Sequence, residues 1–282
     1  MKMKLHRVLS MLASALLALA ALSPASAKTL VLEGSDATTF HGAQAGGDTY
    51  TEQLWAFMRQ GSALPMIVFG TSPIPHADPG TVFTNDLTGL SAASYSALYI
   101  QSPGGCCDQN LAGASAFAAQ IGAFYAAGGS VAIQDYQGGN WSFIDPVLAT
   151  PPAGAVMGYN TGGGGPTCTD NEVFNTEGLS KGFTQPPALG CWEHQAYSMA
   201  YFGALGFLSL VDSDPAYFGL DASGKALGSA FLALGGSLGT PGCTDPTGAT
   251  CNGGGTTVPE PGSLALLGSV LLGMLVTRRK RG

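Results

Sequence analysis

Short apolar runs alternate with amphipathic segments along residues 28–240 of this 282-residue chain. In two segments, 48–62 and 111–127, apolar side chains recur at helical spacing, and each pattern ends close to a glycine. Four runs have the length and composition of buried strands: 28–35, 65–70, 96–102 and 130–134. Because strands and helices alternate, the pattern predicts an α/β fold with a mostly parallel sheet.

The alternation continues less regularly toward the C-terminus. Further strands are predicted at 155–159, 205–212 and 229–236, and a helix at 194–203. Residues 28–240 suffice for one full hydrophobic core, so we expect a single flavodoxin-like domain of three layers. Residues 241–257 are turn-rich and glycine-rich, which predicts a loop followed by a flexible stalk.

The N-terminus has the pattern of a secretory signal peptide. Basic residues come first, an apolar stretch follows at 8–22, and Ala25-Ser26-Ala27 has the small residues of a cleavage site. Residues 1–27 are therefore predicted to be removed, which leaves Lys28 as the first residue. The alternative, a first transmembrane helix, requires a longer apolar run.

The C-terminus combines three features in a fixed order. Prolines flank an acidic residue, an apolar run follows at 262–277, and a basic cluster ends the chain. The apolar run predicts a short transmembrane helix, and the basic cluster predicts that its last end stays in the cytoplasm. The residues concerned are Val258, Pro259, Glu260 and Pro261, and then Arg278, Arg279, Lys280 and Arg281.

This order resembles the PEP-CTERM sorting signal of Gram-negative bacteria, over residues 258–282. The resemblance implies passage through the Sec translocon, membrane attachment by the C-terminal helix, and removal of the tail by an exosortase. It also implies a final place at the cell surface or in the extracellular matrix, where exopolysaccharide is a further partner. A plain tail anchor preceded by a proline turn is the alternative.

Charge separates the body of the protein from its termini. The whole chain has a formal charge of −7, but residues 28–258 contain four Lys and Arg against 17 Asp and Glu, a formal charge of −13. An acidic surface repels phosphate backbones, so nucleic acid is excluded as a partner. The acidic groups either keep an exported protein soluble or attract cations.

All six cysteines follow residue 27, where export allows disulfides to form. We expect a local bridge between Cys243 and Cys251, and a second between Cys168 and Cys191. Cys106 and Cys107 are adjacent and pair either with each other or elsewhere. A zinc site is the alternative, although no two cysteines have CxxC spacing.

Four segments resemble the class I glutamine amidotransferase-like group, including its trehalose-utilisation-type relatives: YSALYIQSPGG, FYAAGGSVAIQDYQGG, NTEGLSKGF and SAFLALGGSLG. The resemblance implies a flavodoxin-like domain with a nucleophile elbow after residue 133. At that turn the chain has Gln134-Asp135-Tyr136 and no cysteine, and no histidine follows residue 239. A glutaminase mechanism is therefore not expected.

Polar residues after the predicted strands could converge on one edge of the sheet, where α/β proteins bind ligands. A polar ligand such as a sugar, or a cation, could contact this edge; loop-capping aspartates and a disulfide are the alternative. Catalysis would depend on Asp135, His41 or His194. The possible ligand residues are Asp36, His41, Asp108, Gln134 and Asp135.

No GxSxG, HExxH or phosphate-loop motif occurs, and no cofactor or resident metal is predicted. Three functions remain open. The domain binds a ligand or partner without turnover, it hydrolyses extracellular polysaccharide, or it is a structural, disulfide-stabilised matrix component.

Overall fold

The structure, a computed structural model, describes ten segments of the chain. They all belong to the first of its two compact units, Met1–Gly239, and the second unit, Thr240–Gly282, contains no described residue. The described residues are 28–39, 41–43, 45–70, 73–101, 112–134, 146–158, 173–184, 195–212, 219–225 and 227–235.

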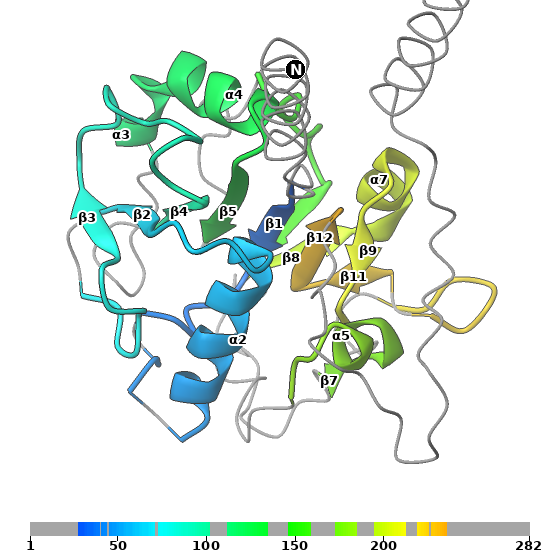
Figure 1. Ribbon diagram of the computed structural model, residues 1–282. Coiled ribbons are helices and arrows are strands. Elements are labelled where there is room, and N and C mark those ends of the chain that lie inside the picture. Colours follow the sequence, from blue (N-terminus) through cyan, green and yellow to red (C-terminus); the bar gives the residue numbers. More distant parts are fainter. Residues whose placement is uncertain are drawn as a thin grey trace, which may run out of the picture. The chain divides into compact units, whose positions relative to one another are not determined.

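A seven-stranded mixed sheet forms the centre of the described part (Figure 1). Five neighbouring strands are parallel, and two further strands extend the sheet beside the first strand of the chain. Each of these two is antiparallel to the strand before it in the sheet. The order across the sheet is β3 (Val82–Thr84), β2 (Met66–Phe69), β4 (Ala97–Ile100), β5 (Ser130–Gln134), β1 (Leu30–Glu33), β12 (Phe231–Leu234) and β9 (Leu208–Ser209).

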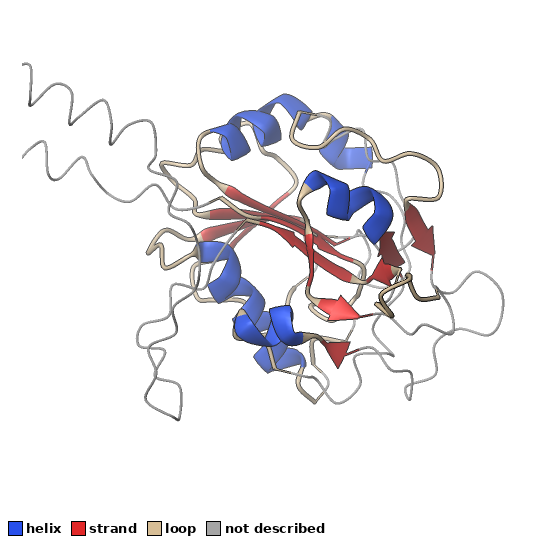
Figure 2. Ribbon diagram, turned by 90° about the vertical axis from the view of Figure 1, so that its right-hand side faces the viewer, coloured by secondary structure: helices blue, strands red, loops and turns tan. Residues whose placement is uncertain are grey.

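Helices cover both faces of this sheet (Figure 2). One face packs against α3 (Ala112–Ser115), α4 (Ala118–Ala126) and α7 (Met199–Phe202), and a 3₁₀ turn, Gly203–Leu205, follows α7. The other face packs against α2 (Gly47–Arg59) and α5 (Thr176–Ser180). The result is the helix–sheet–helix layering that the sequence predicts.

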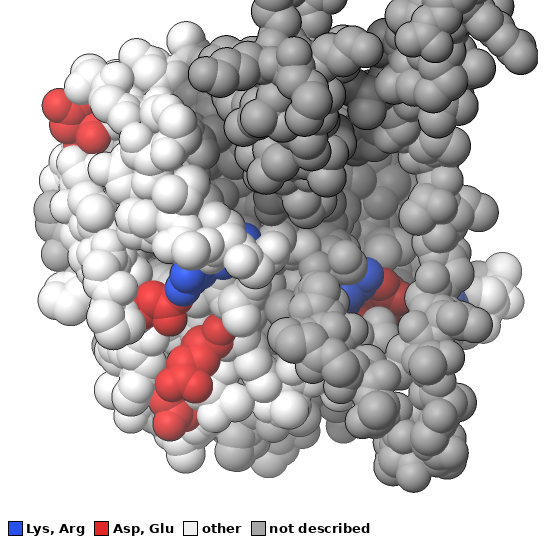
Figure 3. Space-filling view, viewed as in Figure 1, with Lys and Arg blue, Asp and Glu red and all other residues white. Residues whose placement is uncertain are grey.

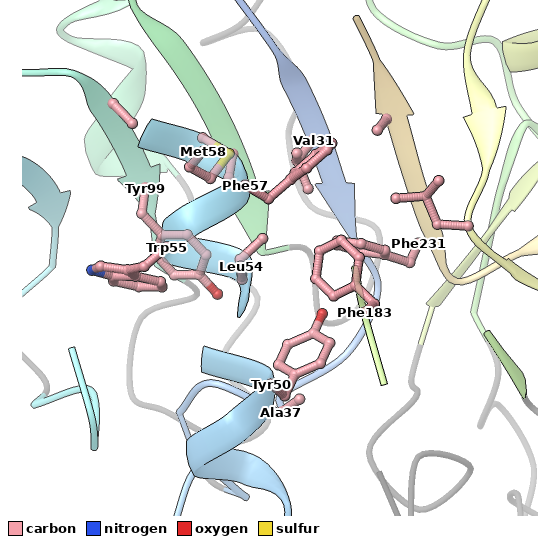
Figure 4. Packing of buried hydrophobic residues seen from close by; sticks show 14 of the residues in the cluster. Val31, Ala37, Tyr50, Leu54, Trp55, Phe57, Met58, Tyr99, Phe183 and Phe231 are labelled. Atoms are coloured by element: carbon pink, nitrogen blue, oxygen red, sulfur yellow. The ribbon is translucent and has the colours of Figure 1, made fainter. Parts of the chain in front are cut away.

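Alternating side chains of the strands feed two separate cores. In β1, Leu30 and Leu32 belong to the core beneath α4, whereas Val31 belongs to the core beneath α2. The second core is rich in aromatic rings: the ring centroids of Phe183 and Phe174 are 5.1 Å apart in a stacked pair. Tyr50 lies beside Phe183 (Figure 4). Side chains that follow Val31 on the same face of β1 therefore point toward α2.

Two small sheets join the large one. β8 (Gln195–Ser198) pairs with β6 (Val156–Gly158) and β11 (Gly228–Ser229), and β7 (Val173–Phe174) pairs with β10 (Val211–Asp212). The junction lies at Gly34, whose N–H donates to the Ala230 carbonyl at 2.7 Å and whose carbonyl accepts from the Gln195 N–H at 2.8 Å. A Cβ atom at Gly34 would lie 2.0 Å from the Gln195 carbonyl oxygen, so this position requires glycine.

The α/β class and the parallel strands are confirmed, but the strand order differs from the expected one. A flavodoxin-like sheet has the order 2-1-3-4-5, with the first strand between the second and third. Here β1 lies between β5 and β12 instead. The antiparallel strand β12 occupies the position beside β1, so the second strand of the chain pairs elsewhere.

Several element predictions are also corrected. The helix expected at 194–203 is a strand over Gln195–Ser198, because pairing with β6 and β11 decides its conformation, and only Met199–Phe202 is helical. The helix expected at 111–127 is divided into α3 and α4 by a turn before residue 118. The strand expected at 205–212 divides between β9 and β10.

Both terminal signals and all six cysteines lie outside the described residues. The signal peptide at 1–27, the helix at 262–277, the domain boundaries at 240 and 257 and the disulfide pairs thus remain predictions. Within the described segments, none of the helices is long and apolar enough to cross a membrane.

Candidate functional site

Three buried polar side chains meet at the carboxyl ends of three neighbouring parallel strands. Glu33 ends β1, Gln134 ends β5, and Tyr99 precedes the last residue of β4. Each is fully buried, and Glu33 pairs in register with Gln134. This edge is where α/β sheets place ligand contacts.

The Glu33 carboxylate is held by hydroxyl groups from three directions. Tyr99 donates to Oε2 at 2.5 Å, Ser35 donates to Oε1 at 3.2 Å, and the hydroxyl of Tyr50 on α2 is a third partner. Burial raises the pKa of Glu33 to about 7; these three hydrogen bonds oppose the rise, and the nearby Asp36 adds to it. Glu33 thus exchanges its proton near neutral pH.

The surroundings of Tyr99 keep its phenol protonated. Burial, followed by the adjacent Glu33, raises the pKa of the Tyr99 phenol well above its ordinary value. Tyr99 therefore keeps its proton and acts as a hydrogen-bond donor to the carboxylate. Its ring packs on Trp55 of α2, with centroids 5.2 Å apart (Figure 4).

The segment after β1, residues 34–39, is called the β1 loop below, and side chains from β4 and β5 anchor it. The Thr38 hydroxyl lies 2.5 Å from the Tyr99 hydroxyl. The Gln134 Nε2 group lies within hydrogen-bond distance of the Ser35 carbonyl at 3.1 Å, of Thr38 Oγ1 at 3.3 Å and of Thr39 Oγ1 at 3.0 Å. Two strands thus fix the position of the loop.

Asp36 and His41 pair at the end of this loop. The backbone carbonyl of Asp36 accepts hydrogen bonds from the N–H groups of Thr39 and His41, at 3.1 and 3.2 Å, which forms a compact turn. The Asp36 carboxylate then lies 3.4 Å from His41 Nε2. Asp36 is 1% exposed and the His41 side chain 13% exposed, so the imidazole is the part of the pair that reaches solvent.

The structure brings Asp36, His41 and Gln134, three of the proposed ligand residues, together around one loop, and their role in ligand binding stays a prediction. Asp108, Asp135 and His194 lie outside the described residues, as do Cys106 and Cys107. The proposed catalytic combination of His41 with Asp135 or His194 is thus not tested by the structure.

Sequence reasoning missed Glu33, Tyr99 and Thr38. An acidic residue directly after three apolar strand residues was the available signal, because it marks a charged group at the carboxyl end of a buried strand. Tyr99 carried no comparable signal, since a tyrosine inside an apolar run is typical of ordinary strand packing.

Two further features of the described part bear on ligands. A hollow of about 210 Å³ lies at the opposite, amino edge of the sheet, and no charged side chain lines it. Its lining consists of Ser62, Leu64, Ala92, Tyr95, Ser96, Ala127, Gly128 and Gly129. The described segments contain no cluster of three or more metal-ligating side chains. Figure 3 shows a mostly uncharged described surface with a few acidic and basic groups.

Comparison with known proteins identifies only the C-terminal segment. Residues 257–281 match the PEP-CTERM protein-sorting motif. The chain carries an exosortase sorting signal. This match confirms the prediction made from residues 258–282. It implies an exported protein whose precursor is anchored in the membrane, is processed by an exosortase and then becomes extracellular.

No curated protein and no solved structure matches the chain. The resemblance of the body to glutamine amidotransferase-like domains is therefore without support from either comparison. The function of the body has to be argued from its own residues.

Proposed function

We propose that this chain is a cell-surface or extracellular-matrix protein of a Gram-negative bacterium whose α/β domain binds a polar ligand without turnover. The sorting motif at 257–281 is the observation that carries the delivery to the surface. The Sec translocon and the exosortase are the partners that this route requires. Exopolysaccharide is the ligand class that we favour, because it surrounds the processed protein.

The fixed β1 loop supports the binding role. Hydrogen bonds from Tyr99 and Gln134 hold Thr38, and the turn at Asp36 holds His41. A loop that is ordered before a ligand arrives loses less conformational entropy on binding.

A hydrolase acting on polysaccharide is the second candidate, and the near-neutral pKa of Glu33 favours it. Glycoside hydrolysis commonly uses one carboxylic acid that holds its proton near neutral pH and a second, ionised carboxylate. Glu33 would take the first of these roles. In a purely structural matrix component, the same network would serve only to stabilise the fold.

Mass spectrometry of protein released from the surface tests the sorting route. The processed protein should lack Arg278–Arg281, whereas a chain truncated after residue 257 should be released without any anchored precursor. A surface product that still carries the four basic residues would contradict exosortase processing.

Titration of the processed protein with purified exopolysaccharide tests ligand binding. His41→Ala should weaken binding at least severalfold, and His76→Asn, at an exposed histidine outside the β1 loop, should not. Release of new reducing ends that stops in Glu33→Gln would favour the hydrolase, and absence of both binding and turnover would favour the structural role.

A further inference from the structure

We propose that Glu33, Tyr99 and Thr38 form a proton-operated hydrogen-bond switch that sets how firmly the β1 loop is held. The three side chains form an unbroken chain: Glu33 Oε2 lies 2.5 Å from the Tyr99 hydroxyl, which lies 2.5 Å from Thr38 Oγ1. All three are fully buried, so water does not compete for these bonds. As the regulation of a ligand site, the switch rests on the binding function proposed above.

The direction of the hydrogen bonds among Glu33, Tyr99 and Thr38 depends on one proton. An ionised Glu33 has no hydrogen, so Tyr99 donates to it and must accept from Thr38. A protonated Glu33 can donate to Tyr99, and Tyr99 then donates to Thr38. The bond between the Tyr99 and Thr38 hydroxyls can run in either direction, because each hydroxyl can donate or accept. Adding one proton to Glu33 therefore reverses both hydrogen bonds, and no covalent bond other than the new O–H changes.

The reversal ends at a residue of the β1 loop. With Glu33 ionised, the Thr38 hydrogen is committed to Tyr99. With Glu33 protonated, Thr38 accepts from Tyr99 as well as from Gln134, and its own hydrogen is released to another acceptor. The loop that carries Asp36 thus receives a different set of bonds in the two states.

Solvation gives the direction of the effect. In the described segments, the titratable groups that face Glu33 are Tyr99 from β4, Tyr50 from α2 and Asp36 from the loop; β5 and β12 present Gln134 and Phe231, which are uncharged. Burial penalises the carboxylate more than these donors favour it, which accounts for the pKa of about 7. Ionisation therefore favours any opening of the β1 loop that admits water to Glu33.

The size of the effect follows from linkage. If opening returns the Glu33 carboxyl from a pKa of about 7 to the ordinary 4.5, the ratio of open to closed loop rises roughly tenfold between pH 6 and pH 8. The amides of Thr39 and His41 report this ratio, because both donate to the Asp36 carbonyl within the closed turn.

Hydrogen–deuterium exchange of the processed protein at pH 6 and pH 8 tests the switch. After correction for the intrinsic exchange rate, protection of the β1 loop should fall roughly tenfold in the wild type and remain constant in Glu33→Gln. A pH step that persists in Glu33→Gln, or that is absent from the wild type, overturns the proposal.

Two threonine variants separate the switch from simple loss of packing. Thr38→Val removes the bond that couples the β1 loop to Tyr99, so the loop can open without admitting water to Glu33; the Glu33 titration should remain while the pH step in loop protection shrinks. Thr29→Val is the matched control, because Thr29 is also fully buried but its Oγ1 has no hydrogen-bond partner among the described residues. Equal pH steps in the two variants would refute the role of Thr38.

The Glu33 titration itself is followed through Trp55, which packs on Tyr99. With Trp141 and Trp192 replaced by Phe, emission should change with a midpoint near pH 7 and should be flat in Glu33→Gln. If Thr38→Val does not fold, Tyr99→Phe replaces it, since it interrupts the same chain. Exopolysaccharide binding without the pH step refutes the switch alone, and the step without binding refutes the binding function alone.

Discussion

Replacing Gly34 by alanine should loosen the junction between the two sheets beside the site. The new Cβ atom would lie 2.0 Å from the Gln195 carbonyl oxygen, whereas ordinary contacts begin at 3.4 Å, so one strand has to move by more than 1 Å. That movement weakens the two hydrogen bonds of Gly34, at 2.7 and 2.8 Å. Each bond contributes about 1 kcal/mol, and crowding of a packed site adds about 1–3 kcal/mol.

The unfolded chain offsets part of this cost, because alanine has less conformational freedom than glycine, by about 0.4–1 kcal/mol. Gly34→Ala should therefore lower the free energy of unfolding by about 2–4 kcal/mol. Urea denaturation followed by circular dichroism measures it. Gly89→Ala is the matched control, since no atom lies within 4 Å of its added Cβ and its φ is outside the left-handed region. If the two variants are equally stable, the close approach at Gly34 is refuted.

Three further changes test other parts of the described fold. Because the pKa of Glu33 is about 7 in the folded protein and 4.5 when exposed, the folded state holds the extra proton and the free energy of unfolding falls by roughly 3 kcal/mol as pH rises through this window. Glu33→Gln should remove that fall. If urea denaturation gives the same pH dependence of the free energy of unfolding for the wild type and the variant, the effect of burying Glu33 is contradicted. Phe183→Leu should lower the free energy of unfolding by about 2 kcal/mol, because Phe183 packs among several aromatic rings. Phe83→Leu is the control and should lower it by less than about 0.5 kcal/mol, because the Phe83 ring is 37% exposed. Asn175→Ala should lower the free energy of unfolding by about 1–2 kcal/mol, measured by thermal unfolding, because the Asn175 side chain accepts from two N–H groups at the start of α5. Asn175→Ser should recover only the capping part of this loss, because serine lacks the Nδ2 group that donates to the Ser209 carbonyl and to Asp212.

The sequence predicted those features that are encoded within a few consecutive residues. The sorting signal is linear, so the order of prolines, apolar run and basic cluster sufficed to find it. The strand at 130–134 matched β5 in full, because a short apolar run bounded by glycine leaves little choice. The layering of helices on a parallel sheet followed from the same alternation.

Long-range pairing explains what the sequence could not show. Gln195–Ser198 has a helical pattern, yet it pairs with β6 and β11, which are distant in the chain. The position of β12 beside β1 likewise depends on contacts across some 200 residues. The site follows the same rule: Tyr99 bonds Glu33 from 66 residues away, so its role exists only in the folded chain.

Glu33→Gln can also separate the structural and functional readings of this buried carboxyl. Glutamine has nearly the same shape, and its amide oxygen can accept from Tyr99 or Ser35, so a purely structural network should tolerate it. It should then be more stable than the wild type at pH 8, because no charge is buried, and should bind ligand equally well at every pH. If Glu33 instead serves as a proton-binding group, the wild type binds ligand with different affinity at pH 6 and pH 8, and the variant gains the same stability but loses this difference. The variant gains stability in both cases, but only in the second case does ligand binding by the wild type respond to pH, which makes the ligand titration of both proteins at pH 6 and pH 8 the deciding measurement.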